Sequence, residues 1–231
     1  MSRQARNTPG GLVYHVLNRA NGRLRLFRKD EDFLAFEEVL LEAMKRRPVR
    51  LLDWCLMSNH WHFVVWPRKE DDLTEFFRWL THTHTQRWHA HHGTSGMGHV
   101  YQGRFKAFPV QEDDHLERVL RYVQLNPVRA RAAARASAWR WGSCHIRKSG
   151  PAELGKLLSD WPIAMPQNWD RWLDVGVDPS DRARFAIAIQ RSQPLGDPGW
   201  TRRIATRLGL EHTLNPLGRP KTEGGNESRP L

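Results

Sequence analysis

Residues 57–65 read MSNHWHFVV and lie at the centre of a predicted β-hairpin. The preceding segment, residues 49–57, is mainly apolar and favours one strand, and Ser58 and Asn59 favour a turn. Residues 60–66 then return as a second strand. Because this returning strand is nearly apolar on both faces, we expect it to lie at the centre of a buried sheet.

The flanking sequence supplies the other elements of an α+β fold. We expect a strand over residues 12–18, and Asp30 can cap a helix that runs to about Arg47, with apolar residues at helical spacing. A second helix is expected from Asp71 or Asp72, an extended segment over 99–111 and a third helix from Asp114. This order predicts a ferredoxin-like (RRM-like) antiparallel sheet with helices on one face.

The composition changes after about residue 145. We therefore divide the chain into a first domain at residues 1–145, a Trp-rich helical appendage at 146–215 and a disordered basic tail at 216–231. Within the appendage, short helices are expected near 181–191 and 199–208.

The 231 residues carry 36 Lys+Arg against 25 Asp+Glu, a formal net charge of +11. Residues 1–150 hold 25 of these basic groups and 15 of the acidic ones, a net of +10, and Arg outnumbers Lys 29 to 7 in the whole chain. Such an Arg-rich domain favours phosphate and nucleic-acid partners, although a high charge can also serve solubility alone.

Several other classes of protein are excluded or disfavoured. No apolar run approaches the roughly 18 residues of a membrane-spanning helix. The N-terminal residues lead into no apolar signal segment, and Cys55 and Cys144 are too few for a disulfide framework. We therefore expect a cytoplasmic protein without a membrane partner, and the sequence leaves open whether it is a monomer or a homodimer.

His60 and His62 are separated by one residue on the predicted central strand. The period of two in a strand points both imidazoles to the same side, where they could hold a divalent metal or serve as ordinary histidines on a wet face. His82 and His84 have the same spacing on a predicted helix, where the two side chains diverge. A second cluster is conceivable among His82, His84, His89, His91 and His92, but a solvated helix end is the simpler interpretation because no cysteine or acidic ligand accompanies them.

The third predicted helix carries one of only three tyrosines. Arg118, Tyr122 and Asn126 are four residues apart and project along one edge of this helix, beside its apolar stripe, and Pro127 is expected to end it. A phenol with an ordinary pKa of about 10 becomes a useful nucleophile when cations or a metal favour its ionised form. The alternative is a boundary tyrosine with a hydrated hydroxyl.

Taken together, the motifs resemble the HUH single-strand DNA transposases with one catalytic tyrosine, and in particular the REP-associated tyrosine transposases. The resemblance covers residues 12–145, and parts of the segment 209–221 resemble tails in that branch. Its motifs are YHV at 14–16, MSNHWHFVV at 57–65, YQGRFK at 101–106 and RYVQLNPVRA at 121–130.

This resemblance implies a metal-dependent DNA endonuclease-transposase that nicks and rejoins single-stranded or hairpin DNA at REP-like palindromic repeats. It implies that His60, His62 and Asn126 bind Mg²⁺ or Mn²⁺ and that Tyr122 attacks the scissile phosphate, giving a 5′-phosphotyrosine intermediate without ATP. Tyr101 is expected to pack or to stack on a base rather than act as a nucleophile.

Six basic residues are candidates for DNA contacts, by default to phosphates: Arg104, Lys106, Arg118, Arg121, Arg129 and Arg219. Arg219 lies in the motif GRPK, residues 218–221, which resembles a minor-groove hook, although a disordered charged tail is the simpler account. Two other function classes remain open: a non-catalytic RNA- or DNA-binding module, and a zinc-stabilised structural protein, for which no Cys/His quartet is evident.

Overall fold

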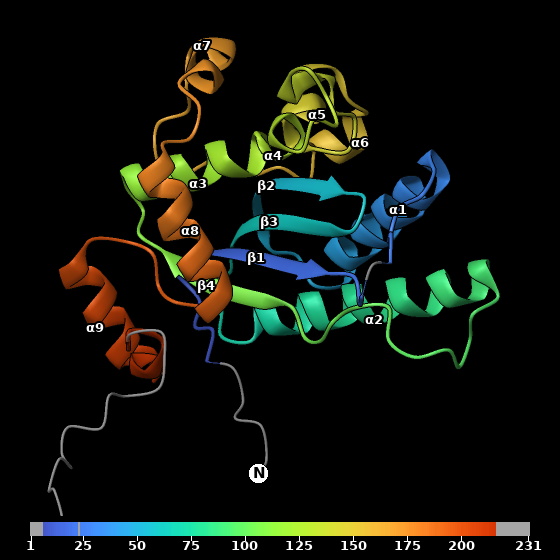
Figure 1. Ribbon diagram of the computed structural model, residues 1–231, viewed down its shortest axis with the longest axis horizontal. Coiled ribbons are helices and arrows are strands. Elements are labelled where there is room, and N and C mark those ends of the chain that lie inside the picture. Colours follow the sequence, from blue (N-terminus) through green and yellow to red (C-terminus); the bar gives the residue numbers. More distant parts are fainter. Residues whose placement is uncertain (1–6, 23, 216–231) are drawn as a thin grey trace, which may run out of the picture.

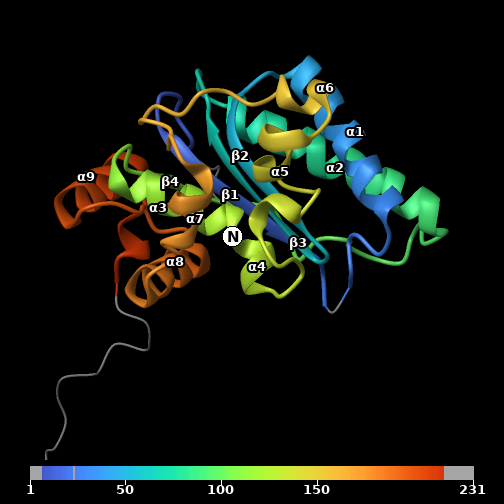
Figure 2. The ribbon, with the colours of Figure 1, turned by 90° about the horizontal axis from the view of Figure 1, so that it is seen from above.

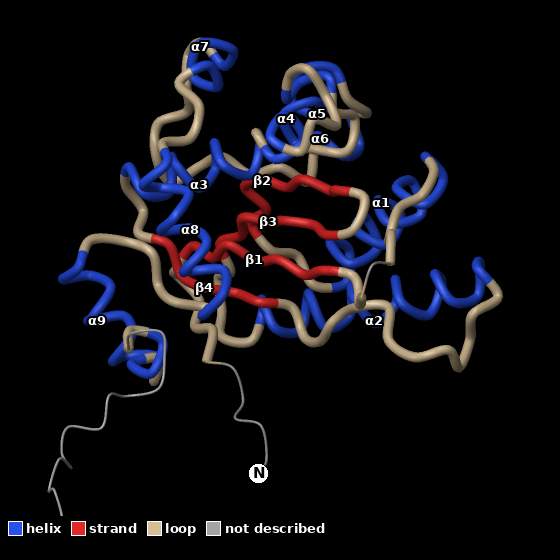
Figure 3. Tube along the Cα trace, in the orientation of Figure 1, coloured by secondary structure: helices blue, strands red, loops and turns tan. Residues whose placement is uncertain are grey.

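The computed structural model describes residues 7–22 and 24–215 and contains one four-stranded antiparallel sheet (Figures 1 and 3). Neighbouring strands follow the order β2-β3-β1-β4, so the hairpin β2–β3 sits beside β1 and β4 forms an edge. The strands are β1 (Val13–Arg19), β2 (Arg50–Met57), β3 (His60–Trp66) and β4 (Lys106–Val110). The predicted α+β class, the antiparallel sheet and the central position of residues 60–66 are confirmed.

The strand β3 shows how the sheet separates two apolar cores. Trp61 and Phe63 are fully buried in the first core, whereas Val64 is fully buried in the second. Successive side chains of a strand point to opposite faces, so both faces of this sheet need a cover.

Two long helices cover the first face of the sheet, α1 (Asp30–Arg46) and α2 (Asp72–His92) (Figure 2). In α1, Phe33, Phe36 and Leu40 recur at helical spacing and are buried against the sheet. Residues 91 and 92 lie in the last turn of α2, and Gly93 then ends the helix in a left-handed conformation.

The second face is covered by α3 (Asp114–Gln124), α4 (Asn126–Arg129) and helices of the C-terminal region (Figure 2). The prediction of helices on one face therefore holds for α1 and α2, whereas α3 lies on the other face. The apolar stripe of α3 predicts that the helix is buried on one side, but it does not say which face of the sheet the helix covers. The remaining elements are η1 (Ala136–Ala138), α5 (Ser143–Ser149), α6 (Ala152–Gly155), α7 (Trp169–Asp174), α8 (Pro179–Arg191), α9 (Pro198–Leu208) and η2 (Glu211–Thr213).

The C-terminal region is joined to the sheet through backbone hydrogen bonds at both edge strands. Leu195 N donates to Pro109 O of β4 at 2.9 Å, and Ser159 N donates to Leu51 O of β2 at 2.8 Å. A domain boundary near residue 145 stays a prediction. The predicted tail, with Arg219, lies outside the described residues.

The helix α3 begins at Asp114 as expected, but its C-terminal end differs from the expected one. Asp113 precedes the helix and caps it by accepting a hydrogen bond from His115 N at 2.8 Å. Pro127 does not end the helix after Asn126; the helix stops at Gln124, and Pro127 lies in the first turn of α4, where a missing backbone N–H is tolerated. Across the described part of the chain, no helix is long and apolar enough to cross a membrane.

Candidate active site

His60 and His62 lie side by side on the second face of the sheet. Their ring centres are 5.0 Å apart and their planes are nearly perpendicular, as the strand period predicts for residues two positions apart. His62 is 3% exposed, whereas His60, at the start of β3, is half-buried. The pair therefore has one imidazole inside the protein and one nearer solvent.

Hydrogen bonds at Nδ1 orient both imidazoles. His60 Nδ1 lies 2.7 Å from Asn59 Oδ1, and because an amide oxygen only accepts, Nδ1 carries the proton and Nε2 keeps its lone pair. His62 Nδ1 lies 2.9 Å from Nε2 of His15, which is buried on β1. When His62 donates this bond, its Nε2 is also available to a ligand.

Burial keeps these imidazoles neutral at pH 7. It lowers the pKa of His60 to about 4 and that of His15 to about 3, and it lowers the pKa of His62 well below its usual range. A neutral imidazole with a free Nε2 and a bonded Nδ1 is the form that binds divalent metals. The histidine pair therefore fits a divalent ion.

Tyr122 of α3 lies next to this pair. Its ring centre is 5.9 Å from that of His62 and 6.2 Å from that of His15, and both contacts are edge-to-face. Two further groups touch the ring: the Arg129 guanidinium carbon lies 4.5 Å from its centre, and the Phe185 ring of α8 lies 4.9 Å away. The phenol is thus held by two imidazoles, a cation and an aromatic ring.

Asn126 is the first residue of α4 and is 8% exposed. Its Nδ2 donates to the backbone carbonyl of Tyr122 at 3.0 Å and to that of Val123 at 3.4 Å. These bonds tie the side chain to α3, the tyrosine helix, and leave the amide oxygen as the atom that could bind a metal ion.

A sequence-family model described as "Transposase IS200 like" matches residues 10–126, half of the chain. This match begins before β1 and ends at Asn126, so it contains the histidine pair and Tyr122. The chain belongs to the IS200-like transposase family.

A solved structure supports the fold of this IS200-like transposase. A REP-associated tyrosine transposase bound to a REP hairpin matches with a TM-score of 0.51 and 19% identity, over 73% of this chain and 94% of that one. At this identity the likeness shows a shared fold. No curated protein gives a significant match.

The basic residues predicted to contact DNA have different surroundings in this transposase. Lys106 Nζ donates to backbone carbonyls of Ile189 at 3.0 Å and Gln190 at 3.2 Å, which ties β4 to α8. Arg104 and Arg129 are exposed. Lys106 therefore has a structural task, and the two exposed arginines are better placed for a nucleic acid.

The two arginines inside α3 are both engaged with acidic groups. Arg121 pairs with Glu117, and its guanidinium carbon lies 5.0 Å from the centre of the Trp172 ring. Arg118 Nη1 lies 3.5 Å from Asp181 Oδ1 of α8. These contacts hold the C-terminal helices against the tyrosine helix.

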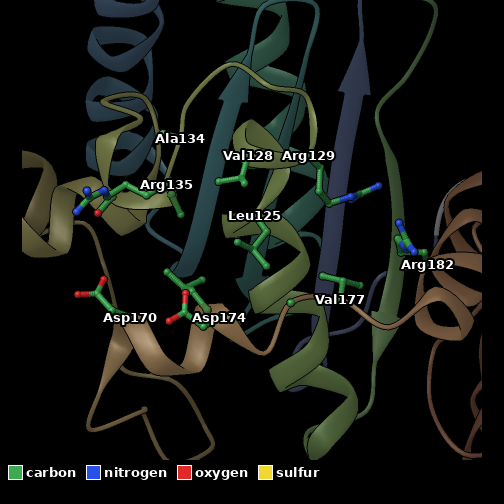
Figure 4. A pocket seen from close by; sticks show the side chains of 13 residues that line it. Leu125, Val128, Arg129, Ala134, Arg135, Asp170, Asp174, Val177 and Arg182 are labelled. Carbon is green, nitrogen blue, oxygen red and sulfur yellow. The ribbon is translucent and has the colours of Figure 1, made fainter.

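A cavity of about 540 Å³ opens beside the C-terminal end of the tyrosine helix (Figure 4). Leu125, Val128 and Val177 form apolar parts of its wall. Its charged lining residues are Arg129, Arg135, Arg182, Asp170 and Asp174. The cavity therefore combines apolar surface with groups of both charges.

Two residues of the site were not singled out from the sequence as functional. His15 was noted only as part of a motif, and its bond to His62 depends on the β1–β3 register, in which Leu17 faces His62. Phe185 comes from the C-terminal region. Tyr101 is buried on the first face, where it accepts from Trp61 Nε1 at 3.1 Å, so it is a packing residue.

A buried polar network fixes α3 to the sheet. Asp53 of β2 is fully buried and accepts hydrogen bonds from Gln124 of α3 and Ser143 of α5. Gln124 Oε1 in turn accepts from Trp169 Nε1 at 2.8 Å. Burial raises the pKa of the Asp53 carboxyl to about 7, against the lowering effect of these hydrogen bonds.

The Asp53→Asn variant is expected to lose part of the pH dependence of stability. The folded carboxyl binds a proton up to about pH 7, whereas an unfolded one releases it near pH 4, so the Asp53 contribution to stability falls as the pH rises through this window. Urea unfolding from pH 4.5 to 7.5 should show a free energy of unfolding whose fall with pH is steeper in the parent than in the variant. Parallel curves would contradict the raised pKa.

Proposed function

We propose that this chain nicks and rejoins single-stranded or hairpin DNA, with Tyr122 as the nucleophile. The observation that carries the proposal is the contact of the Tyr122 ring with His62, on the same face as His60. Membership of the IS200-like family supports the activity, since the matching segment contains all three residues.

His60, His62 and Asn126 would hold Mg²⁺ or Mn²⁺ through two imidazole nitrogens and one amide oxygen. A bound ion of this kind polarises a phosphate oxygen and stabilises the charge that develops during displacement. His15 holds the His62 ring through its 2.9 Å hydrogen bond, so that the ring does not turn away from the substrate.

The reaction is a transesterification. The Tyr122 oxygen gives up its proton to water and forms a bond to the scissile phosphorus. The bond from phosphorus to the 3′ oxygen breaks, and that oxygen takes up a proton from water and leaves as a 3′-hydroxyl. The DNA remains attached as a 5′-phosphotyrosine, and attack by a 3′-hydroxyl reverses the step, so no ATP is needed. Arg129, whose guanidinium lies over the Tyr122 ring, would contact the phosphate.

For the substrate we propose hairpins formed by REP-like palindromic repeats. The net charge of +10 over residues 1–150 supports a nucleic-acid partner, and the solved REP-associated transposase is bound to a REP hairpin. The cavity beside the tyrosine helix has the volume of a small-ligand site, and its arginines suit a nucleotide of the single strand.

An adduct assay tests this function. The full chain is incubated with Mn²⁺ and a DNA hairpin carrying a single-stranded extension, which is labelled at its 3′ end to follow the adduct or at its 5′ end to follow the released fragment. The products are separated under denaturing conditions. We expect a protein-linked DNA band and a fragment with a free 3′-hydroxyl, both absent when EDTA is added. Tight hairpin binding without either product would instead support a binding module.

His15 is expected to act as a positioning residue for His62. In a His15→Leu variant the Nδ1 of His62 loses its partner, and we expect the Mn²⁺ concentration for half-maximal nicking to rise by roughly 10- to 100-fold. A His15→Gln variant supplies an amide near the position of Nε2 and should recover part of the loss. Equal Mn²⁺ requirements in all three proteins would show that His15 does not position His62.

A further inference from the structure

Three potential metal ligands meet on the first face of the sheet, where α1 begins and α2 ends (Figure 2). Asp32 lies in the first turn of α1, and His91 and His92 are the last two residues of α2. One ligand atom from each residue lies within 4.8 Å of the other two. No other group of three His, Cys, Asp or Glu side chains is this close among residues 7–22 and 24–215.

The surrounding structure fixes two of the three ligands. Asp32 Oδ2 accepts from the backbone N–H groups of Arg28 at 2.7 Å and Lys29 at 3.2 Å, which leaves Oδ1 toward His92. The His92 ring packs on Trp88 with ring centres 4.3 Å apart. The side chains of Asp32 and His92 are only 4% and 13% exposed, so water reaches them poorly.

The buried Nε2 atom of His92 has no hydrogen-bond partner. It lies 3.5 Å from Asp32 Oδ1, too long for a good hydrogen bond. This separation is close to the distance of about 3.4 Å between two ligands of a tetrahedral zinc ion with bonds near 2.05 Å.

The site also has an opening. A pocket of about 230 Å³ is lined by the three ligands together with Glu31 and Arg87. Arg87 is paired with Glu42 at 2.7 Å, so its charge is partly balanced. His91 is exposed at this opening and can turn toward an incoming ion.

We propose that Asp32, His91 and His92 bind one zinc ion, with water in the fourth position. Two imidazoles and one carboxylate form a ligand set that zinc favours. The ion would join the start of α1 to the end of α2, on the face of the sheet opposite to Tyr122. Its role would be structural, and it does not depend on the proposed nuclease activity.

Cobalt and zinc binding to the full chain tests this site without any activity assay. The ligand site at His60 is first removed with His60→Ala, and this protein, freed of metal with EDTA, is titrated with Co²⁺. We expect one Co²⁺ per chain, with the visible absorption of a tetrahedral ion that Zn²⁺ abolishes. Zinc at a hundred-fold excess over its Kd should raise the Tm by roughly 5 to 10 °C.

His82 provides a matched control, since it is an exposed histidine on the same helix and outside the group. Adding His91→Ala to the His60→Ala chain should weaken Co²⁺ binding by at least about 100-fold and remove the rise in Tm. Adding His82→Ala should change neither. Co²⁺ binding that survives His91→Ala, or its absence from the His60→Ala chain, would overturn the proposal and would leave the function of Tyr122 untouched.

Discussion

The Tyr122→Phe variant is expected to form no covalent adduct with DNA and to nick hairpins at a rate lower by a factor on the order of 10⁴ or more. The substitution removes one oxygen and keeps the ring. The contacts of that ring with His62, Arg129 and Phe185 are made by its face and edges, so they should survive. The lower nicking rate would therefore come from the missing nucleophile and not from a change in folding. Denaturing gels of Mn²⁺ reactions measure it.

Tyr101→Phe is the matched control for this variant. It removes the same oxygen from a tyrosine on the opposite face of the sheet, where the hydroxyl bonds Trp61 and His84. We expect a lower Tm, because two buried groups lose a partner, and an unchanged adduct. If Tyr122→Phe still formed the adduct, or if Tyr101→Phe alone abolished it at a temperature where both variants are folded, the assignment of the nucleophile would be wrong.

The second large effect is expected for His60→Ala, with a loss of nicking on the order of 10³-fold while hairpin binding is kept. His60 is the better test of the pair because it is half-buried at the start of β3, whereas His62 is buried and bonded to His15. One remaining imidazole and Asn126 would hold Mn²⁺ weakly. Nicking rates, together with hairpin binding measured in EDTA, separate the two effects.

The control for His60→Ala is again a histidine outside the site. His82→Ala, on the exposed side of α2, should nick at the parent rate. A His60→Ala protein that nicks normally at low Mn²⁺ would remove the metal role of the pair. A loss of hairpin binding in step with nicking would assign His60 to DNA contact instead.

The strands and long helices could be predicted because each has its own sequence pattern. The central strand was expected over residues 60–66, where β3 lies, and the first helix was expected within one residue of α1. The same-side placement of His60 and His62 follows from the period of a strand alone. These features depend on neighbouring residues, and short-range rules describe them well.

The missing parts of the site depend on contacts between distant segments. His15 reaches His62 through the register of two strands, and Phe185 reaches Tyr122 because α8 packs on the tyrosine helix. The sequence suggested no acidic ligand beside His92, because Asp32 is supplied by another helix. No local pattern carries such information.

The alternation of side chains between the two faces of β3 also determines which strand register is stable. A shift of this strand by one residue would exchange its faces and place the imidazoles of His60 and His62 in the apolar core, where Trp61 and Phe63 now lie. Buried imidazoles without partners are costly, and Trp61 and Phe63 would move to the second face, where the smaller side chain of Val64 now packs. A chain with the wrong register is therefore unstable, and one that reaches the stable fold has already assembled its histidine pair. The packing of β3 therefore selects the register in which His60 and His62 lie together.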